Sequence, residues 1–144
     1  MSELTRGLDL ALITNRKVSE TKLTDIIEQA IEGGVGTVQL REKDLSTYDL
    51  YCLAKEIREL TEEKDVNLII NDRVDIAIAV DADGVHLGWQ SLKIGIVRNM
   101  IGRDKLIGFS AHSLKEAKMA ENSGADYVTI SPIFETVNKD YFIK

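Results

Sequence analysis

The chain has 144 residues, 44% of them hydrophobic and 29% charged, and a formal net charge of −6 with an isoelectric point near 5.0. This length and composition fit a soluble globular protein with one core, and they exclude a disordered chain. The excess of acidic residues argues against a nucleic-acid-binding surface, and the single cysteine, Cys52, excludes an intramolecular disulfide and a cysteine-based zinc site.

Six short segments rich in Ile, Val and Leu have the pattern of β-strands. They are residues 8–14, 37–41, 67–70, 84–87, 106–110 and 126–130. Helical patterns lie between them, with apolar residues on one helix face at positions Leu23, Ile26, Ile27, Ala30 and Ile31, and again at positions Leu50, Leu53, Ala54, Ile57 and Leu60. Ser46 and Ser113 each stand three residues before an acidic residue, as capping residues do at helix starts.

The alternation of strands and helices at a steady spacing predicts right-handed βαβ units and a parallel sheet. Gly33-Gly34, Gly84, Gly102 and Gly124 fall between a predicted helix and the next strand, where we expect left-handed turns. Two parallel architectures fit this alternation, a doubly wound open sheet and a (β/α)8 barrel. No GxGxxG motif follows the first strand, which weakens a dinucleotide-binding doubly wound fold.

The positions of polar residues favour the barrel. They gather at the carboxyl ends of the predicted strands, at Asn15, Arg41, Lys43, Asn71, Asp72, Ser110, His112 and Ser131. In a barrel these ends share one rim, and barrel enzymes keep their catalytic groups there. The sequence therefore predicts an α/β fold of the TIM-barrel type.

The N-terminal stretch MSELTRGLDLALIT includes Glu3, Arg6 and Asp9 and has no long apolar run. This pattern is not that of a secretory signal, and no segment of the sequence is both long and apolar enough to span a membrane. We therefore expect a cytoplasmic protein.

The segment VQLREKD, residues 38–44, places Gln39, Arg41 and Lys43 on one side if it is extended, because strand side chains alternate. Arg offers phosphate oxygens a planar fork and Lys a point charge, which suits a diphosphate. The alternative is a solvated edge strand on which Glu42 is a surface partner of the cations. The apolar residues at the start of the segment favour the anion site.

Three further sets of polar residues lie in or directly after predicted strands. Asn71 and Asp72 fit either a helix cap or, for the Asp72 carboxylate, a Mg²⁺ site shared with phosphate. His86 fits a hydrogen-bonded interior histidine as well as a functional one. Ser110 and His112 share a strand face, but no acidic residue at a recognisable spacing indicates a catalytic triad. For Ser110 we predict only a hydroxyl donor to phosphate.

Taken in order, VQLREKD, LIINDRVDIAIAVDADGVHLG, IGFSAHSLKEA and GADYVTISPIFETVNKD resemble the thiamine phosphate synthase and thiazole tautomerase family. Several motifs in one order, from the first strand to Lys139, make this resemblance more specific than any one motif. It implies a (β/α)8 barrel and a transferase that couples hydroxymethylpyrimidine diphosphate to thiazole phosphate with release of diphosphate, a step of thiamine biosynthesis.

The resemblance also implies roles for individual residues. The pyrimidine diphosphate would be surrounded by Gln39, Arg41, Lys43, Asn71, Ser110 and Lys139, and the thiazole phosphate would contact Thr136 to Asn138. Asp72 would bind Mg²⁺. Ser91 stands where the family has a second metal-binding Asp, because HLGWQSL replaces the usual HLGQED. A neutral hydroxyl is a poorer ligand, so metal binding should depend more on substrate oxygens.

The chain departs from the family pattern in two more places. FETVNK replaces the usual Pro-Thr-Pro-Thr-Lys, and Ser131-Pro132 stands where the tautomerase branch has a His before a similar FET. The sequence also supplies about six strands, whereas a barrel has eight and usually about 200 or more residues. We therefore predict one partial barrel domain over residues 1–144, truncated before the glycine-rich turns that bind the thiazole phosphate.

Three functions remain open from the sequence. They are a synthase-like transferase, a thiazole tautomerase-like isomerase and a non-catalytic remnant that binds a phosphorylated pyrimidine. The expected partners are small phosphorylated pyrimidine and thiazole substrates, with no nucleic acid and no membrane. The first and last strands of a partial barrel would expose unpaired backbone groups, which predicts a homo-oligomer.

Overall fold

The structure is a computed structural model that describes residues 6–134. The strands are β1 (Ala11–Ile13), β2 (Thr37–Leu40), β3 (Asn67–Asn71), β4 (Gly84–Leu87), β5 (Leu106–Ala111) and β6 (Tyr127–Ile130). The helices are the short 3₁₀ helix η2 (Arg16–Val18) and the α-helices α1 (Leu23–Glu32), α2 (Thr47–Glu63), α3 (Val74–Ala79), α4 (Ile94–Ile101) and α5 (Leu114–Asn122). All six strands predicted from the sequence are present, in the predicted order.

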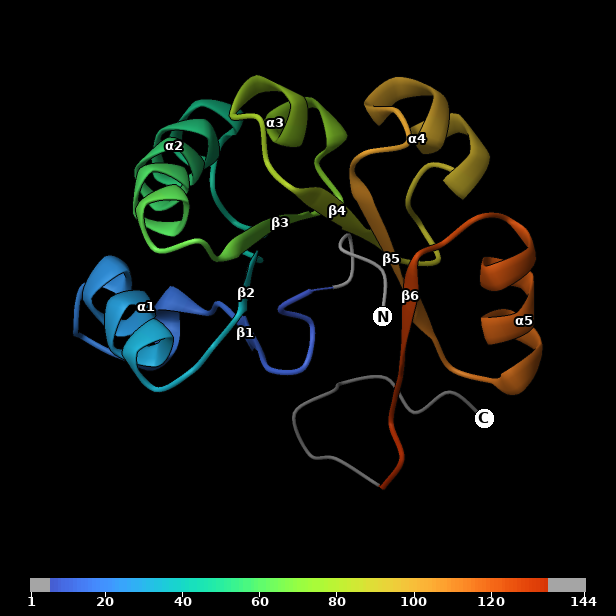
Figure 1. Cartoon of the computed structure of the whole chain (residues 1–144), viewed down its shortest axis with the longest axis horizontal. Helices are drawn as coiled ribbons and strands as arrows, with labels where there is room; N and C mark the ends of the chain where they lie inside the picture. Colours follow the sequence, from blue (N-terminus) through green and yellow to red (C-terminus); the bar gives the residue numbers. More distant parts are fainter. Residues whose placement is uncertain (1–5, 135–144) are drawn as a thin grey trace.

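The six strands form one sheet in the order β1-β2-β3-β4-β5-β6, and every neighbouring pair is parallel. A doubly wound sheet would reverse its strand order partway, whereas a barrel adds each strand on the same side of the last. Figure 1 shows the sheet curving, with the five α-helices along its outer side. The predicted fold class, an incomplete TIM-type barrel, is confirmed.

The two faces of the sheet differ because successive strand side chains point to opposite sides. On the outer face, apolar side chains of the strands pack against the helices in one core, which includes Val38, Leu40, Leu68, Ile70, Val85, Leu87, Ile107 and Phe109 together with Ile27, Ala54, Ile57 and Val97 of the helices. The intervening residues point to the inner, concave face. Gln39, Asn71, His86 and Ser110 are among them, together with the buried apolar residues Ile69 and Leu106, so this face is polar chiefly toward the carboxyl ends of the strands.

The helix starts predicted at two serines are confirmed. Ser46 Oγ accepts a hydrogen bond of 3.1 Å from the backbone N–H of Asp49, and Ser113 Oγ accepts one of 3.2 Å from that of Glu116. Each bond satisfies a backbone N–H that has no partner inside the helix. The serines therefore fix where α2 and α5 begin, directly after the loops that follow β2 and β5.

The predicted left-handed turns are present at Gly34, Gly102 and Gly124, with φ values of 102°, 82° and 91°, and absent at Gly33 and Gly84. Gly33 has a φ of −77° at the end of α1. Gly84 instead lies within β4, where an added Cβ would come within 2.7 Å of the Leu106 Cβ on β5. It is needed for close strand packing, and Asp81, with φ of 51°, makes the left-handed turn before β4.

Within residues 6–134, β1 and β6 each pair with a single neighbouring strand. Both carry exposed apolar side chains, since Ile13 of β1 is 54% exposed and Ile130 of β6 is 46% exposed. The described residues include no helix of the length and apolarity that crossing a membrane requires. One domain over residues 1–144 stays a prediction.

Candidate active site

The carboxyl ends of the parallel strands bring several of the predicted residues to one rim of the concave face. Gln39 and Asn71 meet there, because the Gln39 Nε2 donates to Asn71 Oδ1 at 3.2 Å. Gln39 is buried. The bond joins β2 to β3 and fixes both amide side chains at the top of the inner face, where a ligand in the barrel would lie.

A second cluster joins β4, β5 and β6 on the same face. His86 Nε2 lies 2.8 Å from Ser110 Oγ, and His86 Nδ1 lies 3.1 Å from the Tyr127 hydroxyl. Thr129 Oγ1 is 3.5 Å from Ser110 Oγ. Gly108 makes room for the two rings, since an added Cβ would overlap the Tyr127 ring and stand 2.5 Å from His86 Nδ1.

The His86 ring is neutral near physiological pH. Burial, with only 4% of the residue exposed, and then the positive charge of Arg41 lower the pKa of His86 to about 4. A neutral imidazole carries one ring proton, so it donates one hydrogen bond and accepts another. Of the two interpretations that the sequence left open, the hydrogen-bonded interior histidine is therefore confirmed, and Ser110 is one of its two partners.

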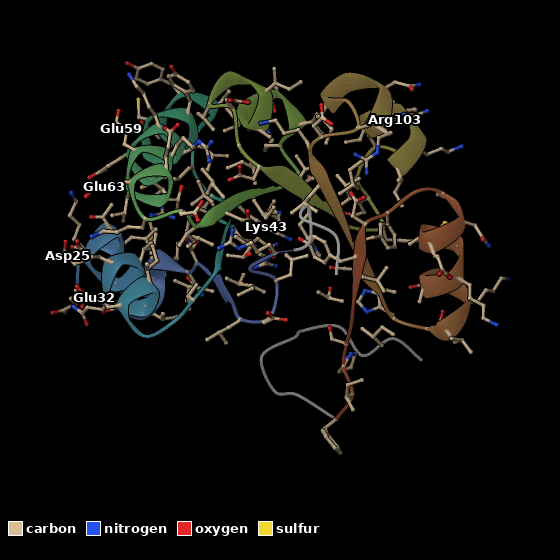
Figure 2. All side chains as sticks on the ribbon, in the orientation of Figure 1. Asp25, Glu32, Lys43, Glu59, Glu63 and Arg103 are labelled. Carbon is tan, nitrogen blue, oxygen red and sulfur yellow. The ribbon has the colours of Figure 1, made fainter. Side chains whose placement is uncertain are left out.

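Arg41 and Lys43 lie just beyond the end of β2, which stops at Leu40. They therefore belong to the loop before α2, and the prediction of a continuous strand face through residue 43 is wrong. Both side chains are exposed, and neither makes a hydrogen bond or ion pair with another residue of the described range 6–134. Figure 2 places Lys43 near the centre of the curve, whereas Asp25 and Glu59 lie around the outer helices α1 and α2.

The alternative in which Glu42 is a surface partner of these cations is also wrong. Only 5% of Glu42 is exposed, and its carboxylate accepts two bonds of 3.0 Å from Arg16, one from the backbone N–H and one from Nη1. Asp44 pairs with Arg16 and with Lys17 at distances of 2.7 Å and 2.9 Å. The acidic residues of the loop thus bond to residues of η2, and the side chains of Arg41 and Lys43 have no partner among residues 6–134.

The Asp72 carboxylate is the candidate metal ligand. It is exposed directly after β3, and within residues 6–134 its side chain makes no hydrogen bond or ion pair. Ser91 Oγ accepts a 2.7 Å bond from the Gly88 N–H, which uses part of its capacity as a ligand. The described residues include no group of three or more His, Cys, Asp or Glu placed to hold a metal. These donors fit a Mg²⁺ ion that shares the oxygens of a phosphorylated substrate, and they do not form a complete protein cage.

Three predicted site residues, Thr136, Asn138 and Lys139, lie outside the described residues. Sequence reasoning missed Arg16, Tyr127 and Gly108. The partners of Arg16 and Tyr127 are far away in the sequence, and no local pattern indicates such contacts. Gly108 left a usable signal, because a glycine inside an apolar strand often marks a close approach of neighbouring groups.

Residues 10–142 match the family model described as thiamine monophosphate synthase. The chain belongs to the thiamine monophosphate synthase family. Among curated relatives, the thiamine-phosphate synthase of Methanobrevibacter smithii is 48% identical over 133 residues, which are 92% of this chain and 64% of that protein. The thiamine-phosphate synthase of Clostridium acetobutylicum is 49% identical over 131 residues, which are 90% of this chain and 62% of that protein.

The fold agrees with this membership of the thiamine monophosphate synthase family. The solved structure of a thiamine phosphate pyrophosphorylase from Pyrococcus furiosus superposes with a TM-score of 0.85 at 38% identity. The match covers 92% of this chain and 64% of that one. The chain thus spans somewhat less than two thirds of the length of these relatives. The activity of the whole relatives is therefore only proposed for this chain.

Proposed function

We propose that the chain provides the diphosphate-binding part of a thiamine phosphate synthase. The reaction is a transfer in thiamine biosynthesis, in which hydroxymethylpyrimidine diphosphate is joined to thiazole phosphate and diphosphate leaves. This proposal rests on Arg41 and Lys43, two cations without a partner among residues 6–134, which lie at the same rim as Asn71 and Ser110. The names of the relatives favour the synthase over the tautomerase alternative, and a cytoplasmic location stays a prediction.

The cations at the rim suit a diphosphate leaving group. Negative charge grows on the diphosphate as its bond to the pyrimidine methylene breaks, and prepositioned donors stabilise that charge without having to reorganise. Arg41 would bind two oxygens through its guanidinium fork, and Lys43 would add a mobile point charge. Gln39 and Asn71 already bond each other, so each keeps only part of its amide for the substrate.

Ser110 would act as a hydroxyl donor whose direction is set by its neighbours. The Tyr127 phenol is a better proton donor than imidazole, so it would donate to His86 Nδ1. The His86 proton then resides on Nε2 and is donated to Ser110 Oγ, which leaves the serine's own proton free for a phosphate oxygen. With the proton on Nε2, Ser110 can donate its hydroxyl proton to the ligand. With the proton on Nδ1, Ser110 would instead donate its hydroxyl proton to His86 Nε2.

Mg²⁺ would be held by Asp72 together with the diphosphate oxygens, with Ser91 as a weaker neutral ligand at the second position. When bound, the ion would neutralise part of the diphosphate charge. The protein supplies one exposed carboxylate for this purpose. We therefore expect the ion to bind with the substrate rather than before it.

The first prediction separates the roles of Arg41 and Asp72. Arg41→Ala should weaken binding of the pyrimidine diphosphate by about ten-fold with or without Mg²⁺, because a charge-assisted hydrogen bond is lost in both conditions. Asp72→Ala should weaken binding only when Mg²⁺ is present. Titration calorimetry with and without the ion measures both effects, and Arg103→Ala serves as a control that removes a cation outside the predicted site.

Equal weakening by Asp72→Ala in both conditions would rule out its metal role. Binding by Arg41→Ala equal to that of the unchanged chain would rule out the diphosphate site itself. The coupling reaction needs a separate assay, because the thiazole site includes residues outside the described range.

A second prediction concerns self-association of the polypeptide made of these 144 residues. Among residues 6–134, β1 and β6 each have one edge without a neighbouring strand, and this edge and the exposed apolar side chains would be covered in an oligomer. We expect a dimer or larger assembly at micromolar concentration, measured by light scattering. Ile13→Lys and Ile130→Lys should shift the population toward monomer, because a charge on a strand edge opposes pairing. A monodisperse monomer with cooperative thermal unfolding would contradict this prediction.

A further inference from the structure

Arg16 connects two loops at the rim of the sheet. Its backbone N–H and Nη1 each donate to the Glu42 carboxylate at 3.0 Å, and Nη1 and Nη2 donate to the two oxygens of Asp44 at 2.7 Å. The same two segments share another hydrogen bond, which the Arg41 backbone N–H donates to Thr14 Oγ1 at 3.0 Å. The loop after β2 is thus fastened to the segment after β1 by side chains that lie 26 and 28 positions apart in the sequence.

The side chains of residues 41–44 alternate in direction because of this connection. Glu42 is buried under Arg16, and Asp44 faces Arg16 and Lys17. Arg41 and Lys43 are left on the other side, exposed and without partners among residues 6–134. A loop without these bonds would be free to rotate, and its acidic residues could then approach the neighbouring cations.

The charge of the loop depends on Arg16 as well. Residues 41–44 contain two cations and two anions, so the segment alone is neutral. Arg16 and Lys17 compensate the two carboxylates and leave the charges of Arg41 and Lys43 available to an anion. The Arg16 guanidinium and then the Lys17 ammonium hold the pKa of Asp44 well below its usual range, so this carboxylate is ionised and in need of compensation throughout the neutral range.

We propose that Arg16 is a positioning residue for the anion site: it holds Glu42 and Asp44 away so that Arg41 and Lys43 face the diphosphate with uncompensated charge. Arg16 itself does not touch the ligand in this arrangement. The inference rests on the proposed function, since it concerns the same site. It adds Arg16, which would affect diphosphate binding indirectly, by fixing the conformation and charge of residues 41–44.

Calorimetric titration with inorganic pyrophosphate at low ionic strength tests the proposal. Arg16→Ala should lower the affinity about ten-fold or more, because one change both frees the loop and uncovers two carboxylates. Lys22→Ala is the control: it removes one positive charge whose carboxylate partner is Glu56 on α2, at 2.5 Å, and not a carboxylate of residues 41–44, and we expect a change of less than about two-fold. Arg16→Lys keeps the charge but lacks the fork that holds two carboxylates, so its affinity should lie between those of Arg16→Ala and the unchanged chain.

A charge rescue distinguishes positioning from mere stability. The double variant Arg16→Ala/Asp44→Asn should recover at least about three-fold of the affinity lost in Arg16→Ala, because one uncovered carboxylate is removed. Arg16→Ala leaves the buried Glu42 carboxylate unpaired, which is destabilising. If that variant does not fold, the comparison is made in the Arg16→Lys background, where Asp44→Asn should likewise raise the affinity.

The outcomes separate the two proposals. Unchanged pyrophosphate affinity in both Arg16→Ala and Arg16→Lys, with binding by the unchanged chain intact, would overturn the role of Arg16 alone. Loss of affinity without any rescue by Asp44→Asn would assign Arg16 a purely structural role and would also overturn the positioning proposal. An unchanged chain that does not bind pyrophosphate would overturn the proposed function and this inference together.

Discussion

The free energy of unfolding is expected to fall by about 3 kcal/mol between pH 6.5 and pH 4, chiefly because of His86. Its pKa is about 4 in the folded chain, against an ordinary value of 6.5. That difference corresponds to about 3 kcal/mol at ~1.4 kcal/mol per pH unit. The loss is large beside the total stability of a small domain, which is about 5–15 kcal/mol.

The sign follows from proton binding. Between pH 6.5 and pH 4 the unfolded chain takes up a proton on His86 while the folded chain does not. Acid therefore favours the unfolded state throughout this window, and the loss is complete below about pH 4. Protonation in the folded state is opposed by burial and by the nearby Arg41 charge, and a doubly protonated ring could accept no hydrogen bond from Tyr127.

Carboxylates contribute in a different pH window. The pKa values of Asp44, Asp75 and Asp81 are lowered from 3.8 by hydrogen bonds to Arg or Lys partners. The stability that these pairs supply is present above that value and is lost as the pH falls below it. A loss that begins near pH 6 is therefore due to His86 and not to these carboxylates.

Urea unfolding at several pH values measures the effect, with one matched control. His86→Gln should lower stability at neutral pH but flatten the dependence between pH 6.5 and pH 4. His112→Gln changes the chain's other histidine, which is exposed, and should keep the slope of the unchanged chain. If His86→Gln retains the full slope, the buried neutral histidine is not the cause.

The fold could be predicted from the sequence because its signals are local. A strand pattern followed by a helix pattern recurs about every twenty to thirty residues. Ser46 and Ser113 mark helix starts because each has an acidic residue three positions later. The position of Gln39, Asn71 and Ser110 followed from a topological rule, since parallel strands end at one rim. These predictions needed no knowledge of which distant side chains touch.

The contacts that complete the site could not be predicted, because they join side chains far apart in the chain. Arg16 and Glu42 are 26 residues apart, and His86 and Tyr127 are 41 apart. In the sequence, Glu42 alternates with cations as a solvated surface charge would, and its burial and its bonds to Arg16 are seen only in the structure. The strand ends at Leu40, so an alternating pattern that suggested one strand continues as a loop.

The last prediction is that these 144 residues bind the pyrimidine diphosphate but couple it to thiazole phosphate at a rate near background. Gln39, Arg41, Lys43, Asn71 and Ser110, which we propose as the diphosphate site, all lie within the described strands and loops. The predicted thiazole contacts begin at Thr136, and the curated relatives extend over about a further third of their length.

Coupling is expected to suffer more than binding because it needs two substrates held at reacting distance. Correct placement of two reactants is worth up to about 7–11 kcal/mol of the barrier, and that contribution disappears when one reactant lacks its anchor. The glycine-rich turns that the family uses for the thiazole phosphate would supply backbone N–H donors. Without them we expect a coupling rate at least about a thousand-fold below that of a full-length relative, with diphosphate affinity within about ten-fold.

A fusion to the remaining third of the Methanobrevibacter smithii relative provides the decisive comparison, since that protein is 48% identical over the shared part. The fusion should form thiamine phosphate at a rate approaching that of the relative, and the same fusion carrying Arg41→Ala should bind the pyrimidine diphosphate about ten-fold more weakly. Formation of thiamine phosphate by the 144-residue chain alone, at an ordinary enzymatic rate of about 1 s⁻¹ or more, would show that the thiazole phosphate needs no anchor beyond these residues. A fusion that binds both substrates but stays inactive would instead point to the substitution of Ser91 at the second metal position as the defect, and Ser91→Asp in the fusion should then restore coupling.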